Sequence, residues 1–341
     1  MTGSSTDPIP SVEPAEQELV TVAIPAHNEG LSIERCVRSI QNQDYTNVQI
    51  IVVDGASQDR TADIVQELAV DDPRVELISN PDRIIPKALN LAVAASRSRW
   101  LVRIDAHAHV PPDYVGRAVK HLRTGEWGAV GGRKDGVGGP PAGDAIAAVM
   151  GSKFGVGGST YHHGTTVRAV EHVPFGAYPI EVIEELGGWD ENLRVNQDFE
   201  FDYRVRESGR QLLFDPELVI HWENRTTIGD LFRQYRRYGR GKVKVARKHP
   251  ASVRPRHFAA PAVLAMIAAG GVAAALGRPR TARALLIPYA GVLAIGTAST
   301  WKNVPAEQRA YIPAAFAAMH VGWGIGFYEG VSDVLRSPRS I

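Results

Sequence analysis

Short apolar runs alternate regularly with segments of helical spacing over the first third of this chain, and this alternation restricts the possible folds more than any other feature. The runs at 19–25, 48–53, 75–79 and 100–104 are rich in Val, Ile and Leu, and we predict that they are buried strands. Apolar residues recur at helical spacing in the segments 33–43, 61–69, 86–95 and 114–122. Such alternation is typical of an α/β fold with a mostly parallel sheet and helices on both faces.

Polar residues follow three of these predicted strands. Asn28 and Glu29 come after the first, Asp54 ends the second, and Asp105 and His107 follow the fourth. Ligands of open α/β sheets lie beyond the carboxyl ends of the strands, so we expect these side chains to share one edge and one site. Asp105 and His107 could hold a divalent ion against a phosphate. The alternative is an Asp that caps a strand, followed by surface histidines.

Length, charge and cysteine content narrow the class of protein. The chain has 341 residues, more than one core of typical size accommodates, so we expect one large domain with an appendage. A formal net charge of +1 argues against a nucleic-acid-binding protein. Cys36 is the single cysteine, which excludes an intramolecular disulfide and favours a part facing the cytosol. Residues 1–18 lack a signal-peptide pattern, and their Ser, Thr, Pro and Glu predict a disordered lead-in.

The middle of the chain contains a further candidate carboxylate. Glycine and proline are dense over 131–158, which predicts mobile loops. A helix is expected to start near Gln197, which places Asp198 in its first turn, where the helix dipole favours a carboxylate. Asp198 is therefore either a functional group or simply a first-turn acid. Residues 212–214 and 218–221 are predicted to form short strands.

The last third of the chain changes in character. A basic helix is predicted over 228–248, in which Arg236 and Arg240 are expected to face lipid headgroups. The segments 257–277, 284–301 and 310–328 contain no Lys, Arg, Asp or Glu and are long enough to cross a membrane as helices. Their Ala-rich and Gly-rich composition leaves buried hairpins of a soluble protein as the alternative. Aromatic residues near the segment ends and the preceding basic run favour a membrane anchor.

Seven motifs, taken together, resemble the family 2 inverting glycosyltransferases of the GT-A fold, and among these the succinoglycan-type glucosyltransferases of exopolysaccharide synthesis. The motifs are IPAHNE (24–29), VVDGASQDRT (52–61), PKALNLA (86–92), RIDAHAHVPPDYV (103–115), VPFGAYP (173–179), NQDFEFDYRVRESG (196–209) and QYRRYGRGKVKV (234–245). Each is weak alone, but their order over most of the chain makes the resemblance specific. It implies a GT-A domain over 19–228, a basic interfacial helix over 229–256, a hydrophobic membrane anchor over 257–330 and a tail over 331–341.

The resemblance implies a donor site at the predicted sheet edge. Asp54 would bond the uracil of a UDP-sugar, while Asp105 and His107 would occupy the Asp-X-Asp motif that binds the metal and the ribose. His107 replaces the second Asp of that motif, which removes a negative charge and suits Mn²⁺ better than Mg²⁺. The other residues that the resemblance places near the nucleotide, the donor sugar or the diphosphate are Pro25, Asn28, Glu29, Lys87 and Asn90.

The resemblance also supplies a base and an acceptor motif. Asp198 matches the family's catalytic base, and Gln234, Arg237 and Tyr238 resemble its Gln-X-X-Arg-Trp motif, which holds the acceptor end and the diphosphate. The chemistry itself requires a positive charge on the leaving diphosphate and a carboxylate that takes the proton of the acceptor hydroxyl. Since no second carboxylate is a clear nucleophile, we expect a single displacement with inversion.

We therefore hypothesise a membrane-anchored, metal-dependent hexosyltransferase whose catalytic domain faces the cytoplasm. It would move a hexose, glucose by resemblance, from a UDP-sugar to a polyprenyl-diphosphate-linked glycan in exopolysaccharide or cell-envelope polysaccharide synthesis. One alternative acceptor is a polyprenyl phosphate, which is already anionic and needs no base. A second alternative is a non-catalytic membrane scaffold that binds a nucleotide sugar. A dinucleotide-dependent dehydrogenase is disfavoured, because no G-x-G-x-x-G follows the first predicted strand.

Overall fold

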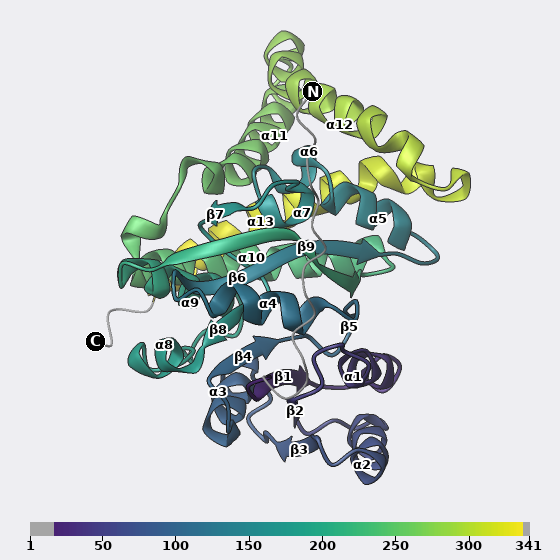
Figure 1. Cartoon of the computed structure of the whole chain (residues 1–341). Coiled ribbons are helices and arrows are strands. Elements are labelled where there is room, and N and C mark those ends of the chain that lie inside the picture. The colour runs from purple at the N-terminus through teal and green to yellow at the C-terminus, as the bar shows by residue number, and fades with distance from the viewer. Residues whose placement is uncertain (1–16, 337–341) are drawn as a thin grey trace, which may run out of the picture.

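A computed structural model describes residues 17–336 of the chain, so most of the predicted lead-in lies outside the described residues. Within the described part, nine strands form one sheet, in which eight follow the order β3-β2-β1-β4-β8-β6-β9-β5 and β7 also pairs with β9 (Figure 1). One half of the sheet is parallel and consists of β1 (Val20–Ala26), β2 (Val48–Asp54), β3 (Val75–Ser79) and β4 (Trp100–Arg103). The other half is mixed and consists of β5 (Ala108–His109), β6 (Trp127–Val137), β7 (Arg168–Val170), β8 (Ala177–Pro179) and β9 (Gln211–Glu223).

Helices cover both faces of the parallel half, which confirms the predicted α/β fold. Alternate residues of β1 point to opposite sides. Val22 and Ile24 join one core cluster with α1 (Ile33–Gln41) and α2 (Thr61–Asp71), whereas Ala23 joins a second with α3 (Ile85–Ala95). Cys36 of α1 is buried in the first cluster, as predicted. The helix α4 (Tyr114–Leu122) also packs into that cluster.

The predicted sharing of one sheet edge by the polar strand ends is confirmed. β1 lies between β2 and β4 and is parallel to both, with Ala26 opposite Asp54 and Ala23 opposite Arg103. The segments that follow these three strands therefore emerge at the same edge. The residues Asn28, Asp54 and Asp105 are brought to one end of the sheet by this register.

The prediction of mobile loops over 131–158 is wrong for most of that stretch. β6 extends through Val137, and residues Gly143–Met150 form α5. The glycines are there because other groups approach closely: a Cβ on Gly131 would lie 2.6 Å from Cβ of Val173, and a Cβ on Gly132 would collide with the carbonyl oxygen of Leu218. In a strand, glycine often marks such close approach or a bulge, and the pairing with β9 shifts register between Gly132 and Arg133.

The two short strands predicted over 212–214 and 218–221 are a single strand, β9. On either side of the register shift, Gly132 pairs with Asp215 and Arg133 pairs with Val219, so three residues of β9 bulge out of the ladder. Pro216, which cannot donate to a ladder, lies within that bulge. Shorter helices precede it: α6 (Lys153–Val156), α7 (Thr160–His163), α8 (Ile180–Glu185) and α9 (Gln197–Glu207).

The basic helix α10 (Ile228–Lys248) has the predicted bounds. It packs along α13 (Ile312–Arg336), and the half-exposed side chains of Arg236 and Arg240 pair with Glu329 and Asp333 of that helix. Glycines of α13 allow the two backbones to approach: a Cβ on Gly322 would lie 2.8 Å from the carbonyl oxygen of Phe232. The third predicted membrane segment is therefore part of a helix that packs on α10.

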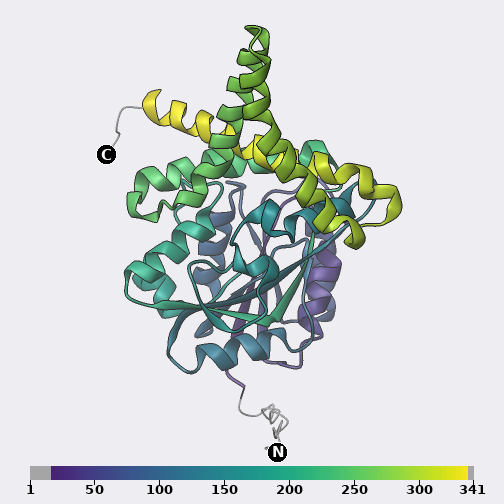
Figure 2. The ribbon, with the colours of Figure 1, turned by 90° about the horizontal axis from the view of Figure 1, so that it is seen from above.

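Two other C-terminal helices are long and apolar enough to cross a membrane, among the described residues. They are α11 (Ala259–Ala275) and α12 (Pro279–Thr300), whose apolar segments extend over Pro255–Ala275 and Pro279–Asn303. A core helix of a soluble protein would be mostly buried, but only 17% of each apolar window is buried here. α11 and the adjoining part of α12 project away from the sheet in both views (Figures 1 and 2). Their composition and exposure indicate membrane association.

Replacing Gly326 tests the α10–α13 contact. A Cβ at this position would collide with the carbonyl oxygen of Arg236. Gly326→Val is expected to lower the free energy of unfolding by about 1–3 kcal/mol, the usual cost of overpacking. Thermal unfolding in detergent measures the change. Gly291→Ala in α12, where a Cβ would meet nothing within 4 Å, is the control. Equal stability of the two variants would contradict the packing described here.

Candidate functional site

The loops after β1 and β2 are bound to each other. The main-chain N–H of Asn28 donates to Oγ of Ser57 at 2.8 Å, and the Asn28 side-chain oxygen accepts from the N–H of Gln58 at 2.8 Å. Asn28 has φ of 55°, a left-handed conformation that Asn tolerates better than most residues. Pro25 and Ala26 end β1 beside Val53 and Asp54. These contacts fix the shape of the edge at which a nucleotide is predicted to bind.

Asp54 is buried at the end of β2. One carboxylate oxygen accepts from the Ser57 hydroxyl at 2.5 Å, and the other accepts from the Ser57 N–H at 3.1 Å. The side chain is thus held in one orientation by its own turn. Such a fixed carboxylate suits recognition of N–H donors on a base.

Arg103 joins two of the predicted site carboxylates. Its side chain, 4% exposed, donates to Oδ1 of Asp105 at 2.9 Å and lies 4.0 Å from Oδ2 of Asp198. Burial alone would lower the pKa of the guanidinium, but the charges of Asp105 and Asp198 outweigh it and raise the pKa. The end of β4 and the start of α9, 93 residues apart in sequence, therefore meet at one cation.

His107 has the arrangement of a metal ligand held by a carboxylate. Its Nδ1 lies 3.0 Å from Oε1 of Glu29, while its buried Nε2 has no hydrogen-bond partner within residues 17–336. Burial alone would raise the pKa of Glu29, but its hydrogen bond with His107 lowers it. An imidazole that donates one N–H to a carboxylate presents the other nitrogen to a metal. The ring also tilts against Trp222, with centroids 5.1 Å apart.

The residues present fit a divalent ion that is completed by its substrate. No group of three or more His, Cys, Asp or Glu side chains that could hold a metal occurs in the described part of the chain. Asp105 and the free Nε2 of His107 provide at most two protein ligands. Ions that act on nucleotide phosphates are commonly held by one or two protein groups together with the phosphates.

Asp198 stands in the first turn of α9, as predicted. Oδ1 accepts from the N–H of Phe199 at 2.8 Å, and the carboxylate is a quarter exposed. Burial alone would raise its pKa, but the charges of His172, Arg103 and Lys134 together with this hydrogen bond lower it. The group is therefore ionised at neutral pH and able to accept a proton.

Three site residues were missed from the sequence, namely Arg103, Lys134 and His172. Lys134 of β6 lies with Nζ 3.3 Å from the ring centroid of Trp222, and burial first of all lowers its pKa to about 8. His172 is held by Asp202, which is fully buried and also accepts from Tyr178. The only signal that could have found Arg103 is its position inside an otherwise apolar strand that ends on Asp105.

The predicted sugar-site residues Lys87 and Asn90 of α3 bind the segment at 189–191. Asn90 accepts from the N–H of Trp189 at 2.9 Å and donates to its carbonyl oxygen at 2.9 Å. Lys87 lies 3.4 Å from Glu191, and Asn90 donates to the same carboxylate. The Asn90 amide thus positions a loop, and Lys87 remains about one-third exposed beside it.

The predicted acceptor motif lies on α10. Gln234 is buried and donates to the Tyr238 hydroxyl at 2.8 Å, while its side-chain oxygen has no hydrogen-bond partner among the described residues. The Tyr238 carbonyl accepts from Asn196, the residue before α9. Burial and then the charge of Asp198 raise the pKa of Tyr238. Arg237 is exposed. Gln234 and Tyr238 are therefore brought towards Asp198, which the sequence spacing alone does not show.

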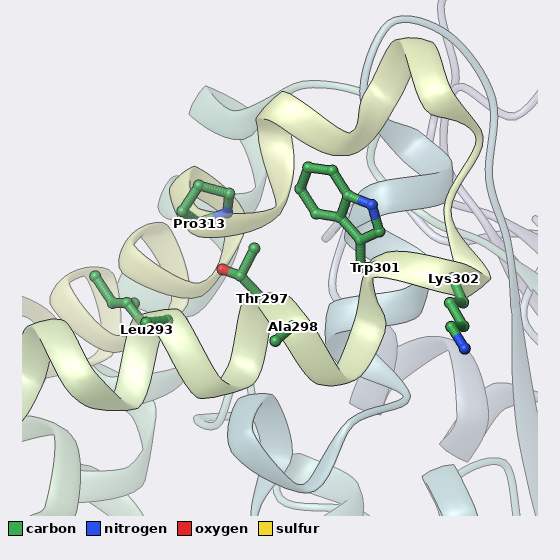
Figure 3. A pocket seen from close by; sticks show the side chains of 7 residues that line it. Leu293, Thr297, Ala298, Trp301, Lys302 and Pro313 are labelled. Atoms are coloured by element: carbon green, nitrogen blue, oxygen red, sulfur yellow. The ribbon is translucent and has the colours of Figure 1, made fainter.

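Two cavities of the described structure are lined by none of the predicted site residues. One of about 490 Å³ lies beside the end of α12 and the start of α13, where Figure 3 shows Leu293, Thr297, Trp301 and Pro313 around it. The other, of about 510 Å³, is lined by residues that include Glu18, Arg99 and Arg210. These two cavities are therefore separate from the residues of the candidate site.

The chain is similar to known glycosyltransferases over most of its length. The model described as "Glycosyl transferase family 2" matches residues 21–152, and that described as "Glycosyl transferase family group 2" matches residues 100–303. "Succinoglycan biosynthesis protein ExoA" of Rhizobium meliloti (strain 1021) is 32% identical over 92% of this chain and 96% of that protein. A Methanococcus voltae protein, "Dolichyl N-acetyl-alpha-D-glucosaminyl phosphate 3-beta-D-2,3-diacetamido-2,3-dideoxy-beta-D-glucuronosyltransferase", is 25% identical over 67% of this chain and 74% of its own length.

A solved structure shares the fold. It is the mannosyltransferase PcManGT from Pyrobaculum calidifontis in complex with GDP-Man and Mn²⁺, with a TM-score of 0.59 and 21% identity. The likeness covers 96% of this chain and 91% of that one. At this level of identity it establishes the shared architecture, including the C-terminal helices.

Proposed function

The chain belongs to glycosyl transferase family 2, and on that premise we propose that it moves a hexose from a UDP-sugar to a hydroxyl of a polyprenyl-diphosphate-linked glycan, with inversion. The observation that carries the proposal is the contact of Arg103 with both Asp105 and Asp198. This contact brings together Asp105, which we propose to lie on the donor side, and Asp198, which we propose as the base. The likeness to a succinoglycan biosynthesis protein supports a role in exopolysaccharide or cell-envelope polysaccharide synthesis.

The donor would lie along the edge formed by β1, β2 and β4. Asp54 would accept a hydrogen bond from the N3–H of the uracil, and the loop at Pro25, Asn28 and Glu29 would enclose the nucleotide. Lys87, which is partly exposed beside Asn90, would meet the sugar or the diphosphate. The structural neighbour is described with GDP-Man, so GDP-mannose belongs in any panel of donors.

Asp105 and His107 would hold a divalent ion, Mn²⁺ or Mg²⁺, and the neighbour's Mn²⁺ supports this. A bound ion supplies positive charge to the leaving diphosphate. Imidazole suits Mn²⁺ better than Mg²⁺. Arg103 carries fixed positive charge in the same place and keeps Asp105 oriented.

Asp198 would take the proton of the acceptor hydroxyl as that oxygen attacks the anomeric carbon. Because the diphosphate leaves from the opposite face, one displacement inverts the configuration. Gln234, Arg237 and Tyr238 would hold the acceptor end. The exposed α11 and α12 would keep the catalytic body at the cytoplasmic face of the cell membrane, where a lipid-linked acceptor presents its sugar.

The second-best acceptor is a polyprenyl phosphate. The basic side chains of His172 and Lys134, which act on Asp198, favour an anionic acceptor. The test is to incubate membranes carrying the protein with UDP-glucose, UDP-galactose and GDP-mannose, Mn²⁺ and either acceptor type, with products identified by mass. Transfer from a UDP-sugar to the glycan supports the proposal. Transfer to polyprenyl phosphate that survives in Asp198→Asn supports the alternative acceptor. The absence of both sugar transfer and donor hydrolysis would favour a non-catalytic scaffold.

Glu29→Gln is expected to weaken Mn²⁺ binding in the presence of UDP by about 10-fold to 100-fold, the usual effect of losing a partner that orients a ligand. The amide cannot fix the Nδ1–H tautomer of His107 as the carboxylate does. Titration of Mn²⁺ followed by electron paramagnetic resonance measures the affinity. Glu34→Gln, on the exposed side of α1, is the control. Unchanged Mn²⁺ affinity in Glu29→Gln would rule out His107 as a ligand oriented by Glu29.

A further inference from the structure

Three basic side chains contact the ring of Phe199, the residue that follows the proposed base. Nζ of Lys242, on α10, lies 3.3 Å from the ring centroid. The imidazole centroids of His172 and His257 lie 5.7 Å and 6.3 Å from it. These residues come from the β7–β8 connection, α10 and the turn η3 (Pro255–Phe258), so separate parts of the chain bring bases to one place.

Lys242 lacks the anion that a buried ammonium normally has. The residue is 4% exposed, and its Nζ is buried with no hydrogen-bond partner among the described residues. Its contact with the face of Phe199 is a cation–π interaction, which offsets only part of the cost of removing a charge from water. Nothing in the proposed donor site or base uses this ammonium.

The surroundings of Lys242 carry an excess of positive charge. The charges of Arg206, Arg254 and Arg256 disfavour the ammonium form of Lys242. The carboxylate of Glu171 has the opposite effect. Both oxygens of Glu171 are already engaged, one by Arg254 at 3.0 Å and the other by Arg256 at 2.7 Å. Burial first, and then these arginines, lower the pKa of Lys242 to about 7. An anion bound here would complete the charge balance.

His172 adds a second basic group at the same ring. Its Nδ1 lies 2.6 Å from Oδ2 of the fully buried Asp202. Burial alone would lower the pKa of His172, but the hydrogen bond and charge of Asp202 raise it, which favours the protonated imidazole. Lys242 is close enough for its charge to oppose this effect and lower the pKa of His172.

The position of Lys242, His172 and His257 around Phe199 indicates the source of an anion that would bind there. η3 leads directly into α11, the first of the two apolar helices. We propose that Lys242 of α10 and His172 of the β7–β8 connection, which both lie against the ring of Phe199, form a subsite for the phosphate group of the lipid-linked acceptor. The inference rests on the proposed function only in naming the acceptor as the source of that phosphate. It places the phosphate beside Asp198, on the route from the membrane helices.

Binding requires a neighbour to move, because Nζ of Lys242 reaches no solvent. His257 touches the same ring and lies on η3. That turn is flanked by the ion pairs of Arg254 and Arg256 with Glu171. A bound phosphate would compete with Glu171 for Arg254 and Arg256. Weakening of these ion pairs would allow η3 to move when the acceptor binds.

The test measures binding of geranyl phosphate, a short prenyl phosphate, to the full-length protein in detergent by calorimetry. Lys242→Met is expected to lower the affinity at least 10-fold, and Lys242→Arg to retain most of it, because phosphate forms charge-assisted hydrogen bonds with either cation. Lys244→Met, an exposed lysine two residues along α10, is the matched control and should not change it. Lys242→Gln is a second neutral variant with the same expectation.

UDP affinity and thermal unfolding show that each variant is folded; replacing an unpaired buried charge by an apolar group is often neutral or stabilising. Equal affinity for geranyl phosphate in wild type and in both neutral variants would overturn the proposal. The proposal would also be overturned if the neutral variants lost only their binding to phosphatidylglycerol vesicles and kept their affinity for geranyl phosphate. The subsite would then hold a membrane headgroup. Because no transfer is measured, failure of the proposed reaction and failure of this subsite are distinguishable.

Discussion

Asp198→Asn is expected to lower the rate of glycosyl transfer by about 10²-fold to 10⁴-fold, the contribution of a positioned proton acceptor. Asparagine has nearly the same shape and can still accept from the N–H of Phe199, so the start of α9 should keep its conformation. The amide cannot take the proton of the acceptor hydroxyl. UDP binding should therefore stay within about two-fold of the wild-type value while transfer is lost.

The measurement pairs a transfer assay with calorimetric titration of UDP. Asp63→Asn, an exposed acid in the first turn of α2, is the control and should behave as wild type in both. A fall in UDP affinity as large as the fall in rate would remove Asp198 from the role of base. It would then be a residue that shapes the donor site through Arg103.

Asp202→Asn is expected to lower the free energy of unfolding by about 3–5 kcal/mol near pH 6, the usual cost of breaking a buried ion pair from one side. Asp202 is fully buried and accepts from the N–H of Val173 at 2.8 Å and the hydroxyl of Tyr178 at 2.8 Å, besides its 2.6 Å contact with His172. An amide would turn one of these acceptors into a donor. The variant should also lose part of its dependence on pH.

The sign of that dependence follows from His172, whose pKa Asp202 raises above its ordinary value of 6.5. The folded protein keeps this proton at a pH at which the unfolded chain has lost it. The stabilisation is therefore complete below about pH 6.5 and falls as pH rises through the folded pKa. Denaturant titrations from pH 5.5 to 9 should show the difference between wild type and variant shrinking as pH rises. A difference that grows with pH would contradict the His172–Asp202 pair.

Local pattern was sufficient to predict the parallel half of the sheet and the edge at which we propose that the donor binds. β1, β2 and β4 are short apolar runs whose neighbours in sequence are helices, so their direction follows from the chain connection itself. Polar residues directly after such strands had to meet at one edge. The shared edge of Asp54, Asp105 and His107 was predictable for this reason.

Residues whose role depends on packing were not predictable in the same way. Gly131 and Gly132 carry a loop signal, but they lie in β6 because other groups approach their Cα atoms. Lys134 and Lys242 look like ordinary surface lysines in the sequence, but Lys242 is buried and Lys134 packs on the ring of Trp222. One signal was present and passed over: Gly322, Gly326 and Gly330 recur every four residues in α13, a spacing that indicates close helix packing.

The account depends on one ion and one nucleotide meeting the residues gathered at the sheet edge. Anomalous diffraction from crystals of the full chain with UDP and Mn²⁺ tests this most directly. The predicted result is a manganese peak bonded to the Asp105 carboxylate and Nε2 of His107, with the uracil at Asp54 and the Asp198 carboxylate facing the diphosphate. A manganese peak elsewhere, with UDP bound away from Asp54 and Asp105, would contradict it.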